Sequence, residues 1–458
     1  MLDKIMFDKI LVCNRGEIAV RIVRACRDLG IPTAVAYSAA DRDSRAVQLA
    51  DDAVCVGPGP AARSYLNIPA LLHAAERVGA DAVHPGYGFL SEDAHFAEIC
   101  GKLGIAFIGP AAGVIAAMCD KARARALMAA AGLPVPAGVE RPLQGLAEAA
   151  ERAAAVGYPV ILKAAAGGGG RGMAVVRHPE RLAAALVEVQ KVARTVFLDD
   201  RVYLERYVEG ARHVEVQVLG DTHGTVVHLG ERDCSIQRRQ QKLLEESPST
   251  VLTPDLRARM GEAAVRGARA VGYSSAGTME FLVDPAGDFY FMEMNTRIQV
   301  EHPLTEMCTG IDLVGWMIRV AAGERLAFSQ DDIRPRGHAI ECRINSEDAG
   351  NDWAGSFGRL GRFVQPGGPG VRVDTHGYAG YQVPPYYDSL LAKVVVHADT
   401  REEAIRRMDR ALAEFDCAGV ATTIGFHRQV LAHPTFAAGE HRLDFVERHL
   451  TPDGRLAA

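Results

Sequence analysis

The first quarter of the chain alternates short apolar runs with helical patterns, and no other feature limits the fold as strongly. Between the first two runs, Ile18, Ile22, Cys26 and Leu29 recur at helical spacing, and Gly30 before Ile-Pro ends the helix. The strand-like runs are KILVC, TAVAYS, DAVCVG, DAVHPG and IAFIGP. Strands separated by helices predict βαβ units and a parallel sheet.

A sheet of this kind often binds a dinucleotide, but the loop after the first run lacks the required signature. That signature is Gly-x-Gly-x-x-Gly between a strand and a helix. The segment CNRGEIA supplies a single glycine, Gly16. We therefore do not expect NAD binding.

Composition narrows the class of protein further. A chain of 458 residues suggests two or three domains, and 48% hydrophobic with 24% charged residues is typical of globular proteins. The net charge of −6 gives no overall attraction to nucleic acid or to an anionic membrane, so neither is expected as a partner.

The cysteines and the N-terminus indicate a compartment. Nine scattered cysteines without a C-x-x-C pair favour neither a disulfide framework nor a zinc site, and they fit a reducing, cytoplasmic location. Charged residues interrupt the apolar residues of MLDKIMFDKILVC, so neither a signal peptide nor a membrane span is expected. The near-duplication of LDKI and FDKI leaves Met1 and Met6 as alternative starts.

Pro and Gly clusters divide the rest of the chain, and the hinge GLPVPAG marks the clearest boundary. The expected divisions are an N-terminal α/β domain over 1–115, a helical connection over 116–133, a compact segment over 134–207, a larger mixed α/β domain over 208–450 and a loose tail over 451–458.

The segment PVILKAAAGGGGRGMAVV places consecutive glycines between two apolar runs. A strand-loop-strand unit is therefore expected, not a Walker A loop, which precedes a helix. Such a loop can bring backbone N–H groups to phosphates as a mobile lid, or it can be an ordinary flexible hairpin. Lys163 and Lys121 are either phosphate contacts or solvated lysines.

Two β-rich runs flanking a Pro/Gly/Asp turn predict a hairpin over GTMEFLVDPAGDFYFMEMN. With a four-residue loop, Asp284 faces Phe289 and Glu280 faces Glu293. Like charges about 5 Å apart cost roughly 3 kcal/mol at an effective dielectric of 20. A hard divalent cation reverses that sign, and Asn295 adds a neutral oxygen. We infer a site for Mg²⁺ and nucleotide, provided that the register does not slip by one residue.

The following segment, EMNTRIQVEH, carries a polar residue at every second position: Glu293, Asn295, Arg297, Gln299 and Glu301. In an extended chain these side chains would converge on one surface of mixed charge. The alternative is an amphipathic strand with one face in water.

Taken together, NRGEIA, HPGYGFLSE, GGGGRGM, ERDCSIQRR and EMNTRIQVEHPLTE resemble the biotin carboxylase family of the ATP-grasp superfamily, in order and over nearly the whole chain. The resemblance implies a three-domain α/β architecture: an N-terminal Rossmann-like parallel-sheet domain, a mobile glycine-rich lid over 134–207, and a mixed α/β C-terminal domain.

The resemblance also implies a reaction. ATP with Mg²⁺ or Mn²⁺ would activate bicarbonate as carboxyphosphate, and the carboxyl group would pass to N1 of biotin. Biotin would be the substrate, attached to a carrier protein.

The resemblance assigns roles to individual residues. Glu301 would be the general base, Arg343 would stabilise the ureido oxygen of biotin, and Tyr87 and Gly88 would border the biotin pocket. Bicarbonate would contact Arg297, Gln299 and the Val300 backbone, and the metal would be held by Glu280, Glu293 and Asn295. Nucleotide contacts would come from Lys121, Lys163, Gly169, Gly170, Glu205, His213, Gln237, Gln240 and Lys242, together with Glu280 and Glu293. Lys242 and Arg297 would also be catalytic.

Three positions depart from the family pattern. Gln240 stands where the family commonly has histidine, and Ala166 replaces a residue that is often the first glycine of the lid. The segment from Trp353 to Leu360 lacks the usual F-x-P-S-x-G wording. None of the three removes a residue to which a catalytic role is assigned.

The chain contains no Met-Lys dipeptide, the motif that carries biotin in family carrier domains. We therefore expect a separate subunit that works with a biotin carboxyl carrier protein and a carboxyltransferase subunit, and the family suggests a homodimer. The reaction would be the first half of an acyl-CoA carboxylase reaction such as that of acetyl-CoA carboxylase, with the acceptor chosen by the carboxyltransferase. The alternatives are another ATP-grasp ligase that forms an acyl phosphate, and a catalytically silent nucleotide-binding subunit.

Overall fold

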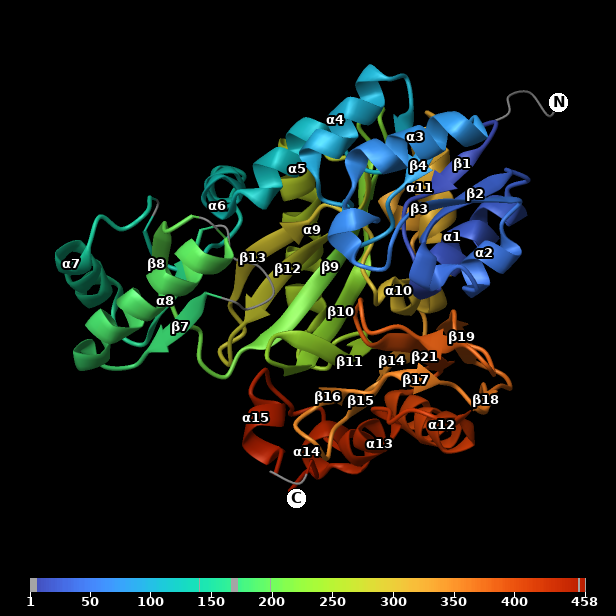
Figure 1. The fold of residues 1–458 in the computed structure, drawn as a ribbon. Helices are drawn as coiled ribbons and strands as arrows, with labels where there is room; N and C mark the ends of the chain where they lie inside the picture. The colour runs from blue at the N-terminus through green and yellow to red at the C-terminus, as the bar shows by residue number, and fades with distance from the viewer. Residues whose placement is uncertain (1–5, 140, 166–171, 198, 452–453, 458) are drawn as a thin grey trace.

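The structure is a computed structural model that describes residues 6–139, 141–165, 172–197, 199–451 and 454–457 (Figure 1). The predicted parallel sheet forms at the N-terminus in the order β3-β2-β1-β4-β5, with every pairing parallel. Its strands are β1 (Ile10–Val12), β2 (Thr33–Ser38), β3 (Asp52–Gly57), β4 (Ala82–His84) and β5 (Ala106–Phe107). Each strand-like run of the sequence is therefore a strand of this sheet.

Helices connect these strands because their apolar residues recur at helical spacing. In α1 (Gly16–Asp28), Ile18, Ile22 and Cys26 are buried, as that spacing predicts. The other connecting helices are α2 (Arg45–Leu49), α3 (Ile68–Val78) and α4 (Ala94–Lys102). The Ala-rich stretch that follows forms α5 (Ala112–Cys119) and α6 (Lys121–Ala130), and between them Asp120 caps α6 by accepting the Arg123 N–H.

A small lobe stands apart from the rest of the molecule at the left of Figure 1. It contains a three-stranded sheet in the order β7-β6-β8 with two helices packed on it. These elements are β6 (Val160–Ala164), β7 (Met173–Val176), β8 (Val202–Arg206), α7 (Leu146–Val156) and α8 (Leu182–Val196). Strands β6 and β7 pair antiparallel on either side of the glycine-rich segment, so the strand-loop-strand prediction is confirmed.

An antiparallel sheet of eight strands forms the centre of the molecule, in the order β13-β12-β9-β10-β11-β14-β21-β19. Its strands are β9 (Arg212–Gly220), β10 (Val226–Arg238), β11 (Gln241–Ser247), β12 (Ser275–Val283), β13 (Phe289–Asn295), β14 (His338–Asn345), β19 (Val371–Thr375) and β21 (Leu390–Ala398).

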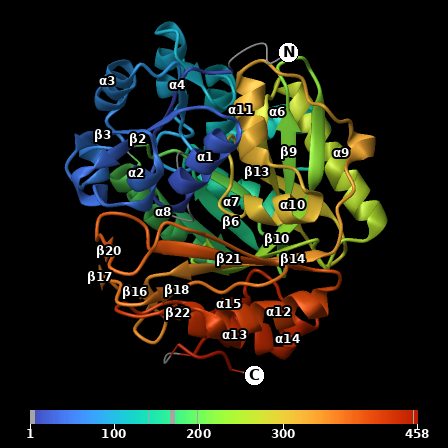
Figure 2. The same cartoon turned by 90° about the vertical axis from the view of Figure 1, so that its right-hand side faces the viewer.

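Helices cover both faces of this sheet (Figure 2). One face, called here the α12 face, packs its apolar side chains against α9 (Pro254–Ala270), α12 (Arg401–Glu414) and α13 (Ile424–Ala432). The other, the α10 face, meets α10 (His302–Thr309) and α11 (Leu313–Ala321), beside the N-terminal sheet.

The remaining described elements are short. They are α14 (Pro434–Ala437), α15 (Phe445–His449) and the strand pairs β15 (Glu347–Asp348) with β16 (Ala354–Gly355), β17 (Gly358–Arg359) with β20 (Gln382–Val383), and β18 (Phe363–Val364) with β22 (Asp416–Cys417). Among the described residues, no helix is long and apolar enough to cross a membrane.

Glu280 lies opposite Glu293 in the β12–β13 hairpin, as predicted, but the loop and the register differ from the prediction. The prediction that Asp284 faces Phe289 is wrong, because Val283 pairs with Phe289 and the Asp284 N–H donates to the Asp288 carbonyl at 2.8 Å. A register shift between Glu280 and Phe281 then compensates for the longer loop.

The prediction of an extended strand through EMNTRIQVEH is also wrong beyond Asn295, where β13 ends. The chain then turns, and α10 begins at His302 with Pro303 in its first turn, a position that a proline tolerates.

Candidate active site

One partly buried lysine holds three carboxylates together on the α10 face. Lys242 Nζ donates to Glu215 Oε2 and Glu301 Oε1 at 2.6 Å each, and to Glu280 Oε1 at 3.1 Å. The carboxylates come from β9, β12 and the residue before α10. Segments far apart in the sequence therefore meet at a single ammonium group.

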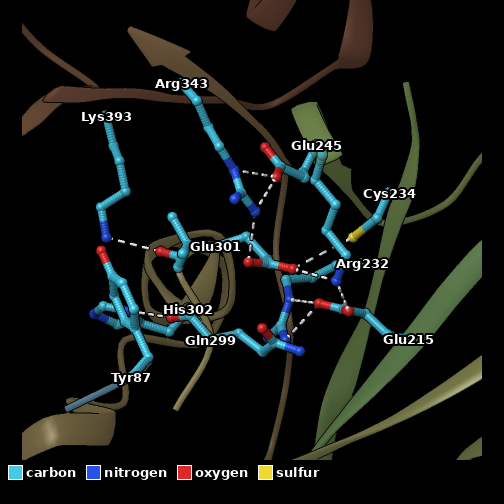
Figure 3. A network of polar contacts seen from close by, with 12 residues as sticks. Tyr87, Glu215, Arg232, Cys234, Glu245, Gln299, Glu301, His302, Arg343 and Lys393 are labelled. Atoms are coloured by element: carbon cyan, nitrogen blue, oxygen red, sulfur yellow. Dashed lines mark hydrogen bonds and ion pairs between the residues drawn. The ribbon is translucent and has the colours of Figure 1, made fainter. Parts of the chain in front are cut away.

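Two arginines complete this cluster (Figure 3). The buried Arg232 donates to Glu215 Oε1 at 2.6 Å. Arg343 donates to Glu301 Oε2 at 2.9 Å and to Glu245 Oε1 at 2.7 Å. A buried arginine requires an anionic partner, and Arg343 has two, Glu245 and Glu301.

The charge state of Glu301 follows from these contacts. Burial alone would raise the pKa of this carboxyl, but Lys242, Arg343 and Arg232 outweigh burial and hold the pKa well below its usual range. Glu301 is therefore an ionised carboxylate at neutral pH, with a different cation on each oxygen.

Glu280 accepts several further contacts. Its Oε1 accepts from Asn295 Nδ2 at 2.8 Å and from Gln299 Nε2 at 3.0 Å, and its Oε2 lies 3.1 Å from His213 Nε2. Burial raises the pKa of Glu280, but Lys242 and His213 lower it by more than burial raises it, so this carboxylate is also ionised.

The hairpin supplies donors of the type that a hard divalent cation takes. Glu293, directly opposite Glu280 on β13, places its side chain 3.6 Å from Lys121 Nζ. The two cross-strand carboxylates are oxygen donors of the kind that Mg²⁺ prefers. Asn295 lies beside them, with its Nδ2 facing Glu280 and its Oδ1 facing Arg297. Glu280 and Glu293 are thus suitable ligands for a divalent cation, and Asn295 adjoins them.

The polar residues after Asn295 still gather at the site, although they are not in a strand. Arg297 donates to Asn295 Oδ1 and to Gln299 Oε1 at 2.8 Å each, and its Nε donates to Glu92 Oε2 at 2.9 Å. The turn after β13 therefore brings these polar side chains together, although the sequence predicted that an extended strand would do so.

A second group of predicted nucleotide contacts lies at the small lobe. Lys163 Nζ on β6 donates to Glu205 Oε2 on β8 at 2.6 Å, and Arg125 Nη1 lies 3.0 Å from Glu205 Oε1. Burial raises the pKa of Glu205, but Lys163 and Arg125 lower it overall. Gly169 and Gly170 lie outside the described residues, as does Ala166.

Two glutamines that sequence analysis assigned to the nucleotide differ in position. Gln237 is buried, and its Nε2 lies 2.7 Å from His213 Nδ1, beside the carboxylate cluster. Gln240 is exposed in the turn between β10 and β11, with a φ of +61°. The structure therefore places Gln240 outside the cluster.

Tyr87 and Gly88 border a cavity of about 120 Å³ next to α1. The other polar residues that line it are Asn14, Arg15, Glu17 and Asp388. The Val300 carbonyl, one residue before Glu301, accepts from Lys393 Nζ at 2.7 Å. Tyr87, Gly88 and Val300 thus lie where the N-terminal sheet meets the α10 face.

Sequence analysis missed several groups at this site. The residues not assigned to it are Glu17, Glu92, Glu215, Arg232, Glu245 and Lys393. The alternation of His213, Glu215 and Gln217 along β9 was a usable signal for Glu215. Glu245 meets Arg343 because β11 pairs with β14, and Lys393 meets Glu17 and Val300 because α1 and the turn before α10 pack against β21. No local pattern reveals either arrangement.

Comparison with known proteins gives consistent matches along the chain. Residues 6–115 match the model of the biotin carboxylase N-terminal domain, and 120–329 match the carbamoyl-phosphate synthase L chain ATP-binding domain. Residues 341–448 match the biotin carboxylase C-terminal domain. A biotin carboxylase of Nostoc sp. is 54% identical over 441 residues, which cover 96% of this chain and 99% of the relative.

Two further relatives bear on function. A pyruvate carboxylase subunit of Methanothermobacter thermautotrophicus is 51% identical, with 97% of this chain and 90% of that protein covered. The biotin carboxylase domain dimer of Hydrogenobacter thermophilus 2-oxoglutarate carboxylase, solved with MgADP, ADP and bicarbonate, is 48% identical with a TM-score of 0.95. That match covers 99% of this chain and all of the other chain.

Proposed function

Since this chain belongs to the biotin carboxylase family, we propose that its α10 face activates bicarbonate with ATP and transfers the carboxyl group to biotin on a separate carrier protein. The chain is an ATP-dependent ligase that carboxylates biotin. The observation that carries the proposal is Glu301, an ionised buried carboxylate held between Lys242 and Arg343.

The nucleotide and metal roles follow from the two groups of charges. Glu280, Glu293 and Asn295 hold Mg²⁺ or Mn²⁺, which neutralises phosphate charge when it is bound. Lys121, Lys163, His213, Gln237 and Lys242 contact the nucleotide or its phosphates, and Glu205 lies at the adenine. We retain Gly169, Gly170 and the exposed Gln240 in this role from the sequence.

The first half-reaction begins at bicarbonate. Arg297, Gln299 and the Val300 backbone bind the anion, and Glu301 removes its proton. The freed oxygen attacks the γ-phosphorus of ATP, the bond to the β-phosphate oxygen breaks, and ADP leaves with carboxyphosphate formed. The low pKa of Glu301 makes it a weak base while both cations face it. Substrate anions that share Lys242 and Arg343 would raise its basicity when they bind.

The second half-reaction takes place near Tyr87 and Gly88. The carbon–oxygen bond of carboxyphosphate breaks and phosphate is released, and the phosphate takes the proton that Glu301 holds. Glu301 can then take the N1 proton of biotin, and N1 attacks the carboxyl carbon. Arg343 stabilises the negative charge that develops on the ureido oxygen, as an oxyanion-hole donor does. Its guanidinium already lies 2.9 Å from Glu301, so base and donor are adjacent.

We place the division of the chain at 1–115, 116–133, 134–207, 208–450 and 451–458. The second segment contains the second half of α5 and all of α6, and the third corresponds to the small lobe that acts as the lid.

We also propose a homodimer, because a similar structure is a dimer. We propose a cytoplasmic location, because none of the nine cysteines forms a disulfide.

The proposed partners are the carrier protein and a carboxyltransferase subunit. Relatives of nearly equal similarity are named for biotin carboxylase, for pyruvate carboxylase and for 2-oxoglutarate carboxylase. We propose that the partner sets the carboxylated acceptor, and that this acceptor is an acyl-CoA such as acetyl-CoA.

The test is bicarbonate-dependent ATP cleavage by the purified protein with Mg²⁺, with and without high free biotin. We expect stimulation by biotin and a loss of about 10²- to 10⁴-fold in Glu301→Gln. Glu306→Gln is the matched control, because Glu306 lies on α10 but pairs with Arg21 and Arg372.

The alternatives give different results in the same assay. Cleavage that bicarbonate triggers but biotin does not stimulate would favour another acyl-phosphate ligase. Nucleotide binding without any turnover would favour a silent subunit.

A further inference from the structure

Lys393 is a fully buried cation on β21 that no step of the proposed reaction uses. Its Nζ donates to the Val300 carbonyl at 2.7 Å and lies 3.0 Å from Glu17 Oε1. Asp374 is 4.0 Å away. Because burying a charge is costly without partners, this lysine depends on Glu17 and on the carbonyl that it binds.

Glu17 lies in the first turn of α1, within the motif NRGEIA, and is 2% exposed. It accepts a hydrogen bond from the Tyr87 hydroxyl with the same oxygen that faces Lys393. Burial raises the pKa of Glu17, and Lys393 opposes that rise. One carboxylate thus connects the lysine to the tyrosine that borders the biotin cavity.

This ion pair joins the three parts of the chain that separate family models match. Glu17 and Tyr87 belong to residues 6–115, Val300 to 120–329 and Lys393 to 341–448. The contacts bring the N-terminal sheet, the turn before α10 and β21 to one point. A movement of any of these segments would change the distance between Tyr87 and Glu301.

We propose that Glu17 and Lys393 are positioning residues that fix the biotin-side Tyr87 relative to the base Glu301, through the Tyr87 hydroxyl and the Val300 carbonyl. This inference rests on the proposed function, since it gives the pair a role only if Glu301 acts on bicarbonate beside bound biotin. Val300 immediately precedes Glu301, so a shift of its peptide group displaces the base. A displacement of about 1 Å in a reacting group costs roughly 10²-fold in rate.

The test compares Glu17→Gln, Lys393→Met and the double variant. Each single change leaves a buried charge without its partner and should lower stability, whereas the double change removes both charges and should recover most of it. We expect kcat/KM for free biotin to fall at least about tenfold in all three, because Glu17→Gln weakens the Tyr87 anchor, Lys393→Met removes the Val300 anchor and the double variant does both. KM for ATP should stay within about twofold of the wild type.

Two further variants separate positioning from general stability. Tyr87→Phe removes only the hydroxyl contact and should raise KM for biotin while leaving the melting temperature almost unchanged. Arg401→Met removes a cation that pairs with Glu246 at 2.6 Å on the α12 face. It should lower stability and leave kcat/KM for biotin within about twofold.

The inference is overturned if the double variant regains kcat/KM for biotin together with stability. It is also overturned if the single variants keep the kcat/KM of the wild type. A wild-type protein without biotin-stimulated ATP cleavage would overturn the proposed function and this inference together. A wild type that responds to biotin, with variants that respond equally well, would overturn only the inference.

Discussion

Glu245 and Glu246 are neighbours on β11, both are buried, and they lie on opposite faces of the central sheet. On the α12 face, Glu246 faces Arg401 at 2.6 Å and His338 at 2.8 Å, with His441 at 3.5 Å. These partners outweigh burial and lower the pKa of Glu246 to about 2.

On the α10 face, Glu245 pairs with Arg343 through one oxygen, and its other oxygen has no hydrogen-bond partner among the described residues. Glu341, the cross-strand neighbour of Glu245, has no such partner on either oxygen within the same part of the chain. Burial, more than any other cause, raises the pKa of Glu245 to about 7, and it also raises the pKa of Glu341.

The two faces of the sheet differ in how their buried carboxylates are paired: those on the α12 face stabilise the fold, whereas several on the α10 face are left without enough partners. The α12 face pairs each buried carboxylate with cations of its own, as Asp233 is paired with Arg212 at 2.7 Å. The α10 face holds more carboxylates than its cations satisfy: Glu215, Glu245, Glu280, Glu301 and Glu341. Unsatisfied buried groups are costly. Under the proposed function this face binds a divalent cation and exchanges its own ion pairs for substrate contacts, which accounts for their presence.

The largest effect is expected from Asp233→Asn on the α12 face. This change leaves the buried Arg212 without its anion, so the free energy of unfolding should fall by about 3–5 kcal/mol. Denaturant unfolding measures it, and the folded fraction should keep its biotin-dependent turnover. Asp352→Asn is the control, because Asp352 is 81% exposed in its pair with Arg238. Equal losses in the two variants would contradict the assignment.

Arg343→Met should have the next largest effect, on activity. Removing the proposed oxyanion donor should lower biotin-dependent kcat by about 10²- to 10³-fold. Stability should fall less than in Asp233→Asn, because Lys242 still faces Glu301. Arg343→Lys should recover only part of the activity, since lysine lacks the rigid fork of donors with which the planar guanidinium contacts both Glu245 and Glu301. Full activity in Arg343→Lys would show that the reaction does not require one side chain to contact both Glu245 and Glu301.

A smaller effect is expected from Glu341→Gln, and it depends on pH. Because the folded-state pKa of Glu341 is raised, the folded protein binds more protons than the unfolded chain, and this residue's contribution to stability falls as pH rises above about 4.3. The variant cannot lose this contribution, so its free energy of unfolding relative to the wild type should be higher at pH 8 than at pH 5. Unfolding curves at pH 5 and pH 8 give the comparison, and a difference that does not grow with pH would contradict it.

The sequence predicts the parallel sheet well because each strand of that sheet is a local apolar run bounded by turns. TAVAYS and DAVCVG are the whole of β2 and β3. The opposition of Glu280 and Glu293 was predicted correctly with a wrong loop, since a register shift, which no residue pattern signals, compensated for it. Alternation through Glu301 was misread as a strand because Pro303 and the start of α10 override it.

The parts of the site that sequence did not predict are those made by distant pairings. Lys242 was expected at phosphates, but nothing local indicates that it contacts carboxylates from β9, β12 and the turn before α10. Glu17 and Lys393 meet only because α1 packs against β21. Residue types and their order predict the chemistry, whereas tertiary contacts decide which charges are satisfied.

The most direct test of the contrast between the faces is the same substitution at two neighbouring residues, Glu245→Gln and Glu246→Gln. Unfolding free energy and biotin-dependent ATP cleavage are measured for both. Glu246→Gln should lose about 3–5 kcal/mol of stability and keep turnover per folded molecule, because it leaves Arg401 and His338 without their carboxylate. Glu245→Gln should keep stability within about 1 kcal/mol and lose at least about tenfold in turnover, because Arg343 loses one of its two anchors. Parallel losses of stability and turnover in both variants would contradict the account.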